Sequence, residues 1–82
     1  MKKCLKINLK NEKQIKEFCN INAKSECDID VEKGRGYIDG KSILGVLSLN
    51  LMKPIQVFLF GDDERIEELE NQYKVSDLIF EG

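Results

Sequence analysis

Few residues of this chain have the chemical type and the spacing that a catalytic or metal-binding site requires. It contains no histidine, and we find no nucleophile–base pair. The alternating carboxylates Asp28, Asp30 and Glu32 could bind a cation, but such a row is usually the solvated side of a strand. Gly34-Arg35-Gly36 is too short for a phosphate-binding loop, and the acidic run at residues 62–64 suits a helix start. The sequence therefore predicts no catalytic residue, metal site or cofactor.

Ser42 is the remaining candidate, because it lies at the predicted start of a short and unusually apolar helix. Its hydroxyl can cap that helix, and Asn50 is predicted to end it in the left-handed conformation. The apolar side chains cover more than one stripe of the helix: Ile43, Leu44, Val46, Leu47, Leu49 and Leu51. A small domain has little room for a helix buried on all sides. We therefore expect an exposed apolar patch beside Ser42, with a fully buried helix as the alternative.

The three cysteines, Cys4, Cys19 and Cys27, are odd in number and lack the close spacing of a zinc or redox motif. We expect reduced thiols in a reducing compartment, two of them in or beside the core. A reactive thiol is the less favoured alternative, since the sequence fixes no basic group beside any of them.

The composition indicates one globular domain spanning residues 1–82, with 41% apolar and 34% charged residues. A net charge of −2 with scattered lysines argues against a nucleic-acid surface. No apolar run approaches the length of a membrane span. Lys6, Asn8 and Lys10 interrupt any apolar region of a signal peptide, so we expect a cytoplasmic location.

Hydrophobic periodicity predicts the elements of the first half. Residues Cys4 to Leu9 alternate as a half-buried strand. Asn11 is the predicted cap of the next helix, with Gln14 at the spacing of a capping box. That helix should run to about Ala23, with an apolar face formed by Ile15, Phe18, Cys19 and Ala23.

The second half predicts three strands and two helices. Cys27, Ile29 and Val31 mark a strand, residues 32–36 a turn, and residues 37–39 a short strand that leads to Ser42. Pro54 opens a fourth strand with Ile55, Val57 and Leu59 on one face. Asp62 or Asp63 caps a final helix, whose apolar face is Ile66, Leu69 and Tyr73. Residues 75–80 either continue this helix or add an edge strand.

The resulting order is β-α-β-β-α-β-α. Four strands with one apolar face each need a cover, which three amphipathic helices on one side supply. The sequence thus predicts an α+β fold, a two-layer open-faced sandwich with a four-stranded antiparallel sheet.

Residues Lys41 to Leu49 resemble the helix that carries the regulatory serine in HPr, the phosphocarrier family of the bacterial sugar phosphotransferase system. The resemblance extends upstream over residues 27–34 and downstream over residues 53–57 and 61–64. It is specific around Ser42 and weak over the first 24 residues. It implies the same open-faced sandwich.

The resemblance also implies a missing function. Counting back from Ser42 without a gap sets Asn11 where HPr carries its phosphorylated histidine. Lys13 and Gln14 then stand opposite the family's arginine and proline, and the segment is a few residues shorter. Because neither Asn nor Lys can replace an imidazole in this exchange, we expect no phosphocarrier activity.

By the same resemblance, Ser42 matches the serine that HPr kinase phosphorylates. Ile43, Leu44 and Leu47 match the patch on which phosphotransferase enzymes, that kinase and a transcriptional regulator dock. We expect Lys41 to join this partner-docking surface and, from its place next to Ser42, to add a countercharge. The expected function is a non-enzymatic regulatory docking protein with protein partners, similar to the Crh branch of the family in lacking the histidine. The alternatives are a constitutive adaptor in which Ser42 is only a cap, and a degenerate phosphocarrier that uses an aspartate or a cysteine.

Overall fold

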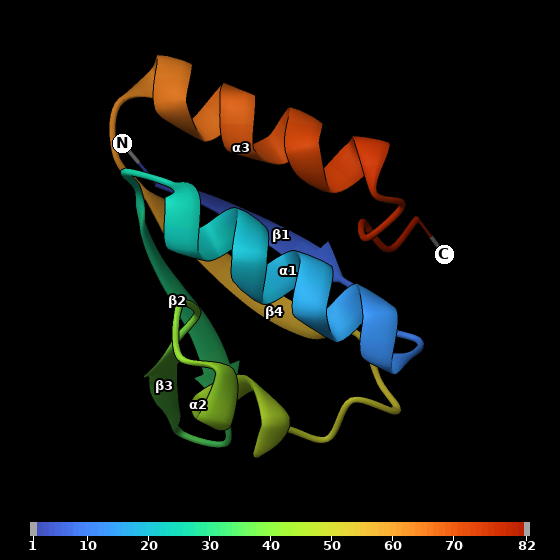
Figure 1. Cartoon of the computed structure of the whole chain (residues 1–82). Coiled ribbons are helices and arrows are strands. Elements are labelled where there is room, and N and C mark those ends of the chain that lie inside the picture. Colours follow the sequence, from blue (N-terminus) through green and yellow to red (C-terminus); the bar gives the residue numbers. More distant parts are fainter. Residues whose placement is uncertain (1, 82) are drawn as a thin grey trace.

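The computed structural model describes residues 2–81 (Figure 1). Its elements follow the predicted order. They are β1 (Lys2–Ile7), α1 (Glu12–Lys24), β2 (Asp28–Lys33), β3 (Gly36–Asp39), α2 (Ile43–Leu47), β4 (Ile55–Phe60) and α3 (Asp63–Val75).

The strands form one antiparallel sheet in the order β1-β4-β2-β3. The last strand of the chain, β4, therefore lies at the centre between β1 and β2. Figure 1 shows α1 and α3 on the same side of this sheet, with its other side left uncovered. The predicted two-layer, open-faced α+β sandwich is confirmed.

The core lies between the sheet and the helices, and period-two burial explains which strand residues enter it. Ile55, Val57 and Leu59 of β4 and Ile29 and Val31 of β2 are all buried, as their alternation predicted. From the helices come Phe18, Cys19, Val46, Ile66, Leu69 and Tyr73. The predicted apolar face of the final helix is therefore confirmed in full.

Three details of the prediction are wrong. The first strand begins and ends two residues early, because its register with β4 runs from Lys2↔Phe60 to Ile7↔Ile55 and Pro54, just beyond, has no amide to donate. Leu9 is nevertheless buried. Ala23 is exposed, and Asn22 lies in the core instead.

The third detail is the end of the Ser42 helix. α2 ends at Leu47 with Ser48 as its C-cap, because the Ser48 backbone amide and hydroxyl both donate to the carbonyl of Gly45. Asn50 is not left-handed; among the described non-glycine residues, only Asp77 has a positive φ, of 58°.

The tail follows the edge-strand alternative more closely than the helical one. α3 stops at Val75, and the left-handed Asp77 turns the chain back toward β1. Leu78 is buried, and Ile79 forms an antiparallel bridge with Ile7. None of the helices within residues 2–81 is both long and apolar enough to cross a membrane.

Candidate functional site

Ser42 caps α2 as predicted. Its Oγ accepts a hydrogen bond from the Gly45 amide at 3.2 Å, and its carbonyl accepts one from the Val46 amide at 3.0 Å. Its own amide donates to the Asp39 carbonyl at 3.0 Å. The Ser42 side chain remains exposed. The hydroxyl is thus held at the start of α2 and open to solvent.

The segment before Ser42 is anchored through Gly40. The Gly40 amide donates to the Ile29 carbonyl at 2.7 Å, and a Cβ on Gly40 would lie 2.4 Å from Cγ2 of Ile29. Any larger residue would push the turn away from β2, so this close approach requires glycine. On the other side, the Asn22 side-chain amide donates to the Gly40 carbonyl at 2.8 Å. The start of α2 is therefore tied to both β2 and α1.

Asn22 also accepts a hydrogen bond from the Tyr73 hydroxyl, and both side chains are fully buried. One side chain thus joins α1, α3 and the turn before α2. Burial, and to a lesser extent the nearby Cys27 thiol, raises the pKa of Tyr73 far above its usual value. Sequence reasoning missed this pair. The available signal was a polar residue four positions after Phe18, on the apolar stripe of α1.

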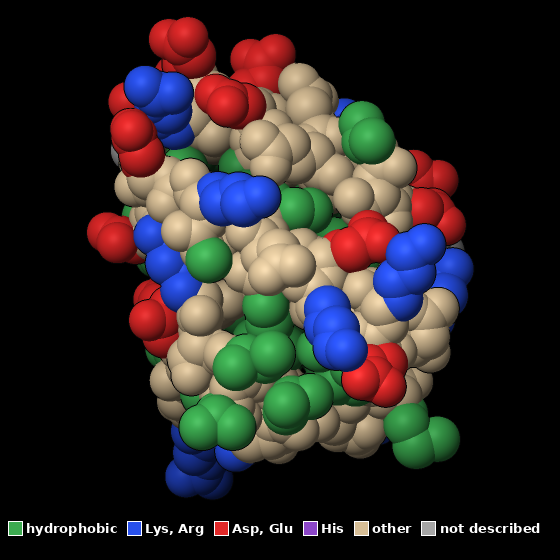
Figure 2. Space-filling view, in the orientation of Figure 1, with side chains coloured by type: hydrophobic (Ala, Val, Ile, Leu, Met, Phe, Trp, Pro, Cys, Tyr) green, Lys and Arg blue, Asp and Glu red, His purple; other side chains and the backbone are tan. Residues whose placement is uncertain are grey.

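The exposed apolar patch expected beside Ser42 is present. Ile43, Leu44 and Leu47 are 46%, 78% and 53% exposed, and we call these three residues the α2 patch. Val46 is fully buried and holds the helix to the core. Figure 2 shows hydrophobic side chains gathered over α2 in the lower part of the view. The expectation of an exposed patch is confirmed, and the alternative of a fully buried helix is wrong.

Lys41 is occupied by an intramolecular contact. Its ammonium donates to the carbonyl of Ser25, just after α1, at 2.9 Å, while its amide donates to Asp39 Oδ1 at 2.9 Å. The side chain is half-buried. Lys41 thus adjoins Ser42 in sequence but does not extend freely over the α2 patch.

Asn11 caps α1, and its environment is that of a structural cap. Its Oδ1 accepts a hydrogen bond from the Gln14 amide at 2.9 Å. Gln14 Oε1 reaches back to the Lys10 amide at 2.8 Å, and its side-chain nitrogen donates to the Asp77 carbonyl at 3.4 Å. The predicted capping pair is confirmed, with the return bond on Lys10 and not on Asn11. Lys13, which the sequence resemblance sets opposite an arginine of HPr, is exposed.

As expected, two of the three cysteines lie in the core. Cys19 and Cys27 are buried, Cys4 is exposed, and all three are free thiols. Burial raises the pKa of Cys19, which disfavours its thiolate. Within residues 2–81, no group of three or more acidic or cysteine side chains is arranged to hold a metal ion.

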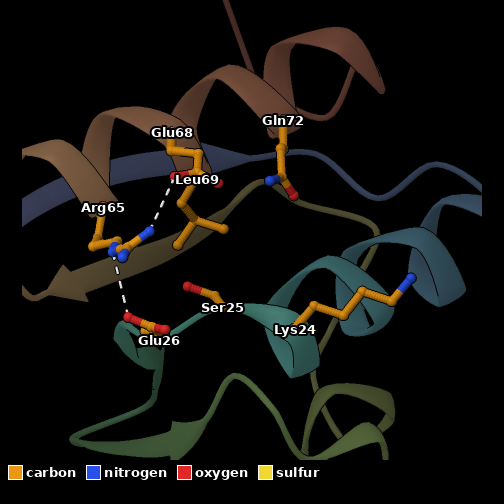
Figure 3. A pocket seen from close by; sticks show the side chains of 7 residues that line it. All are labelled: Lys24, Ser25, Glu26, Arg65, Glu68, Leu69 and Gln72. Atoms are coloured by element: carbon orange, nitrogen blue, oxygen red, sulfur yellow. Dashed lines mark ion pairs between the residues drawn. The ribbon is translucent and has the colours of Figure 1, made fainter.

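A hollow between the end of α1 and α3 is a further candidate site (Figure 3). Its charged groups other than Lys24 are already paired, since Arg65 contacts Glu26 at 3.3 Å and Glu68 at 3.6 Å. In Figure 3, the Lys24 side chain points away from the others. The hollow is lined by Lys24, Ser25, Glu26, Arg65, Glu68, Leu69 and Gln72. Exposed, mutually neutralised charges of this kind do not indicate a reactive site.

Comparison with known proteins supports the assignment of the fold. No family model matches the sequence, and no curated protein matches it either. Among solved structures, HPr-C-His from Thermoanaerobacter tengcongensis is 26% identical, with a TM-score of 0.65 over 87% of this chain and 88% of its own. A phosphocarrier protein HPr from Bacillus anthracis str. Ames is 28% identical, with a TM-score of 0.62 over 88% of this chain and 94% of its own. The resemblance found in the sequence is thereby confirmed at the level of the fold, and the chain has an HPr-like fold.

Proposed function

We propose that this protein is a regulatory docking protein related to the sugar phosphotransferase system, that it carries no phosphoryl group on its first helix, and that it binds partners through the α2 patch. The observation that carries the proposal is the exposure of Ile43, Leu44 and Leu47 directly after an exposed Ser42. A helix that contributes a single buried side chain and presents three large apolar ones is a surface suited to protein contact.

The absence of histidine supports the loss of carrier function. A phosphoryl group of high transfer potential needs an acceptor such as imidazole, and the Asn11 amide oxygen has no such chemistry. The same oxygen is already used to cap α1, which explains why the residue suits the position without any transfer role.

Ser42 is the proposed switch. Its Oγ already points at the Gly45 amide, so a phosphate on this atom would bring up to two negative charges to the free amides at the start of α2. The new charge would stand at the edge of the α2 patch. A partner with Arg or Lys opposite Ser42 gains a charge-assisted bond, whereas one with Asp or Glu is repelled. Lys41, if it leaves the Ser25 carbonyl, supplies the countercharge.

The proposed partners are an HPr kinase, phosphotransferase enzymes or a transcriptional regulator. The constitutive adaptor remains the competing function, and the hydrogen bond from the Gly45 amide to Ser42 Oγ is the specific observation in its favour, because it gives the serine a sufficient structural role.

Titration with a purified HPr kinase tests the docking proposal. We expect Leu44→Ser to weaken binding by at least tenfold, because Leu44 is the most exposed residue of the α2 patch. Val75→Ser is the matched control, since Val75 is 88% exposed but lies at the end of α3. Equal binding by the wild type and both variants would contradict docking through α2.

A further inference from the structure

The uncovered side of the sheet carries aromatic side chains that the fold does not use. Phe58 and Phe60 alternate with the buried residues of β4 and therefore point away from the helices. Tyr37 of β3 is 62% exposed, and its ring meets that of Phe58 edge-on at 5.5 Å. A row of rings on a solvent-facing sheet is an apolar surface that a partner would cover.

Charges of opposite sign flank this aromatic row. On one side, β1 presents Lys2 and Lys6 outward, and the Lys2 ammonium lies 5.7 Å from the centre of the Phe58 ring. On the other side, β2 presents Asp28, Asp30 and Glu32 outward. The register aligns the rows across the sheet: Phe60 pairs with both Lys2 and Asp28, and Phe58 pairs with both Cys4 and Asp30. The face thus has a basic side on β1, Phe58 and Phe60 in the middle on β4 and an acidic side on β2, with Tyr37 beyond it on the edge strand β3.

This arrangement complements itself. Consider a second copy related by a twofold axis that runs parallel to the strands above β4. Its sheet face then lies on the first, with β4 over β4, β1 over β2 and β2 over β1. The lysines of each copy then oppose the carboxylates of the other, while Phe58 and Phe60 meet their own equivalents. An axis perpendicular to the strands would instead oppose like charges.

We propose that the uncovered sheet face binds a second copy of this chain, as a face-to-face dimer with its twofold axis along β4. In this dimer Lys2 faces Asp28 of the second copy and Lys6 faces Glu32 of the second copy. A hollow on the acidic side is lined by Asp28, Asp30 and Asp39 and also by Lys41, whose ammonium is held by the Ser25 carbonyl. A different partner would need a surface with acidic groups opposite β1, apolar rings opposite β4 and basic groups opposite β2. A second copy of this chain has such a surface.

The size of the face makes the dimer weak. The three six-residue strands that oppose one another, β1, β4 and β2, are spaced by about 4.8 Å and offer on the order of 300 Å² per copy, well below the roughly 800 Å² per partner of a standard stable interface. We therefore expect association in the micromolar to millimolar range and a strong dependence on salt. The proposal is independent of the docking function, because α2 belongs to the helix layer.

Sedimentation and amide NMR over a dilution series from about 10 µM to 1 mM test the dimer. The expected result is a concentration-dependent dimer with shifts confined to β1, β4, β2 and β3. A protein that remains monomeric at the highest concentration would overturn the proposal.

Charge reversal identifies the surface. Lys2→Glu with Lys6→Glu should weaken self-association at least tenfold, as should Asp28→Lys with Glu32→Lys, because each reversal opposes like charges in the homodimer. A mixture of the two double variants should restore association, since both sets of contacts are then attractive. All four positions are exposed, so folding should persist and is checked by circular dichroism. Leu44→Ser, on the α2 patch, is the control and should leave the dimer unchanged. A dimer abolished by Leu44→Ser, or a mixture that does not associate, would overturn the assignment.

Discussion

The helices α1 and α2 begin with the same kind of cap but differ in how many side chains they bury. Asn11 and Ser42 each cap a helix by accepting a hydrogen bond from the amide three residues later. The cap of α1 continues into further bonds, because Gln14 binds Lys10 and Asp77. The helix behind it buries Phe18, Cys19 and Asn22. α2 buries only Val46.

Under the proposed function, α1 contributes to stability and α2 to partner binding. α1 is a structural element whose cap, Asn11, carries an amide and no imidazole. α2 is a five-residue helix that would not persist alone, and it is held in place by one buried side chain, a glycine and the Asn22 amide. Its remaining apolar residues are therefore free to serve a partner. Each of the following experiments tests one side of this contrast.

The largest expected effect is a complete absence of phosphoryl transfer at the start of α1. Incubated with enzyme I and phosphoenolpyruvate, the protein should acquire no acid-labile phosphate, whereas an HPr that has the histidine becomes labelled. Stoichiometric labelling would contradict this prediction and favour the degenerate phosphocarrier. Its acceptor would have to be an accessible residue such as Cys4, because Cys19 and Cys27 are buried.

The second effect concerns the link between α1 and α2. Asn22→Ala should lower the free energy of unfolding by about 2–4 kcal/mol, because the Gly40 carbonyl and the Tyr73 hydroxyl both lose a buried partner. Asn20→Ala is the matched control, since Asn20 is exposed in the same helix and its loss should change stability by no more than about 0.5 kcal/mol. Denaturant unfolding measures both, and equal losses would contradict the assigned role of Asn22.

The third effect is a pH dependence of the folding stability, caused by Tyr73, whose hydroxyl donates to Asn22. Burial raises the pKa of Tyr73, so the folded state keeps its proton at a pH where the unfolded state releases it. The stabilisation is complete below the usual tyrosine pKa of about 10 and falls by up to about 1.4 kcal/mol per pH unit above it. Cys19, whose pKa is also raised, adds a loss of the same sign above its ordinary value of 9.0.

Tyr73→Phe removes the phenolic proton and should flatten the decline above pH 10, while lowering stability at neutral pH because Asn22 loses its donor. Unfolding curves from pH 7 to about 11 compare the two proteins. Parallel declines for the wild type and the variant would show that Tyr73 does not titrate as the buried network requires.

The smallest stability effect is expected on α2. Leu47→Ala should change the free energy of unfolding by no more than about 0.5 kcal/mol, because Leu47 is 53% exposed. Val46→Ala, its buried neighbour, should cost about 2 kcal/mol by leaving a cavity. A loss of several kcal/mol for Leu47→Ala would mean that the α2 patch belongs to the core.

The fold could be predicted from the sequence because nearly every helix and strand shows the hydrophobic periodicity of its own type. The alternation of Ile55, Val57 and Leu59 and the helical spacing of Ile66, Leu69 and Tyr73 each identify one buried face. The caps at Asn11 and Ser42 were predictable for a similar reason, since a cap depends on local geometry. For α3 the same signal left Asp62 and Asp63 open, and the structure has Asp62 as the cap.

What escaped prediction depends on contacts between distant residues. Asn22 is polar, and only the approach of Gly40 and Tyr73 from elsewhere in the chain makes its burial favourable. The end of α2 at Ser48 rests on a tertiary bond from Lys33 as well as on local turns, so Asn50 was a reasonable but wrong end residue. The left-handed Asp77 is fixed by the return of the tail to β1.

The most direct test of the central claim is whether Ser42, at the start of α2, is phosphorylated as proposed. Purified protein is treated with an HPr kinase and ATP and then weighed by mass spectrometry, with Ser42→Ala as the control. The account predicts a mass gain of one phosphate in the wild type, located on Ser42, and none in the variant. An unchanged mass, or a phosphate on Ser25, Ser48 or Ser76, would contradict the switch and leave Ser42 as a helix cap alone.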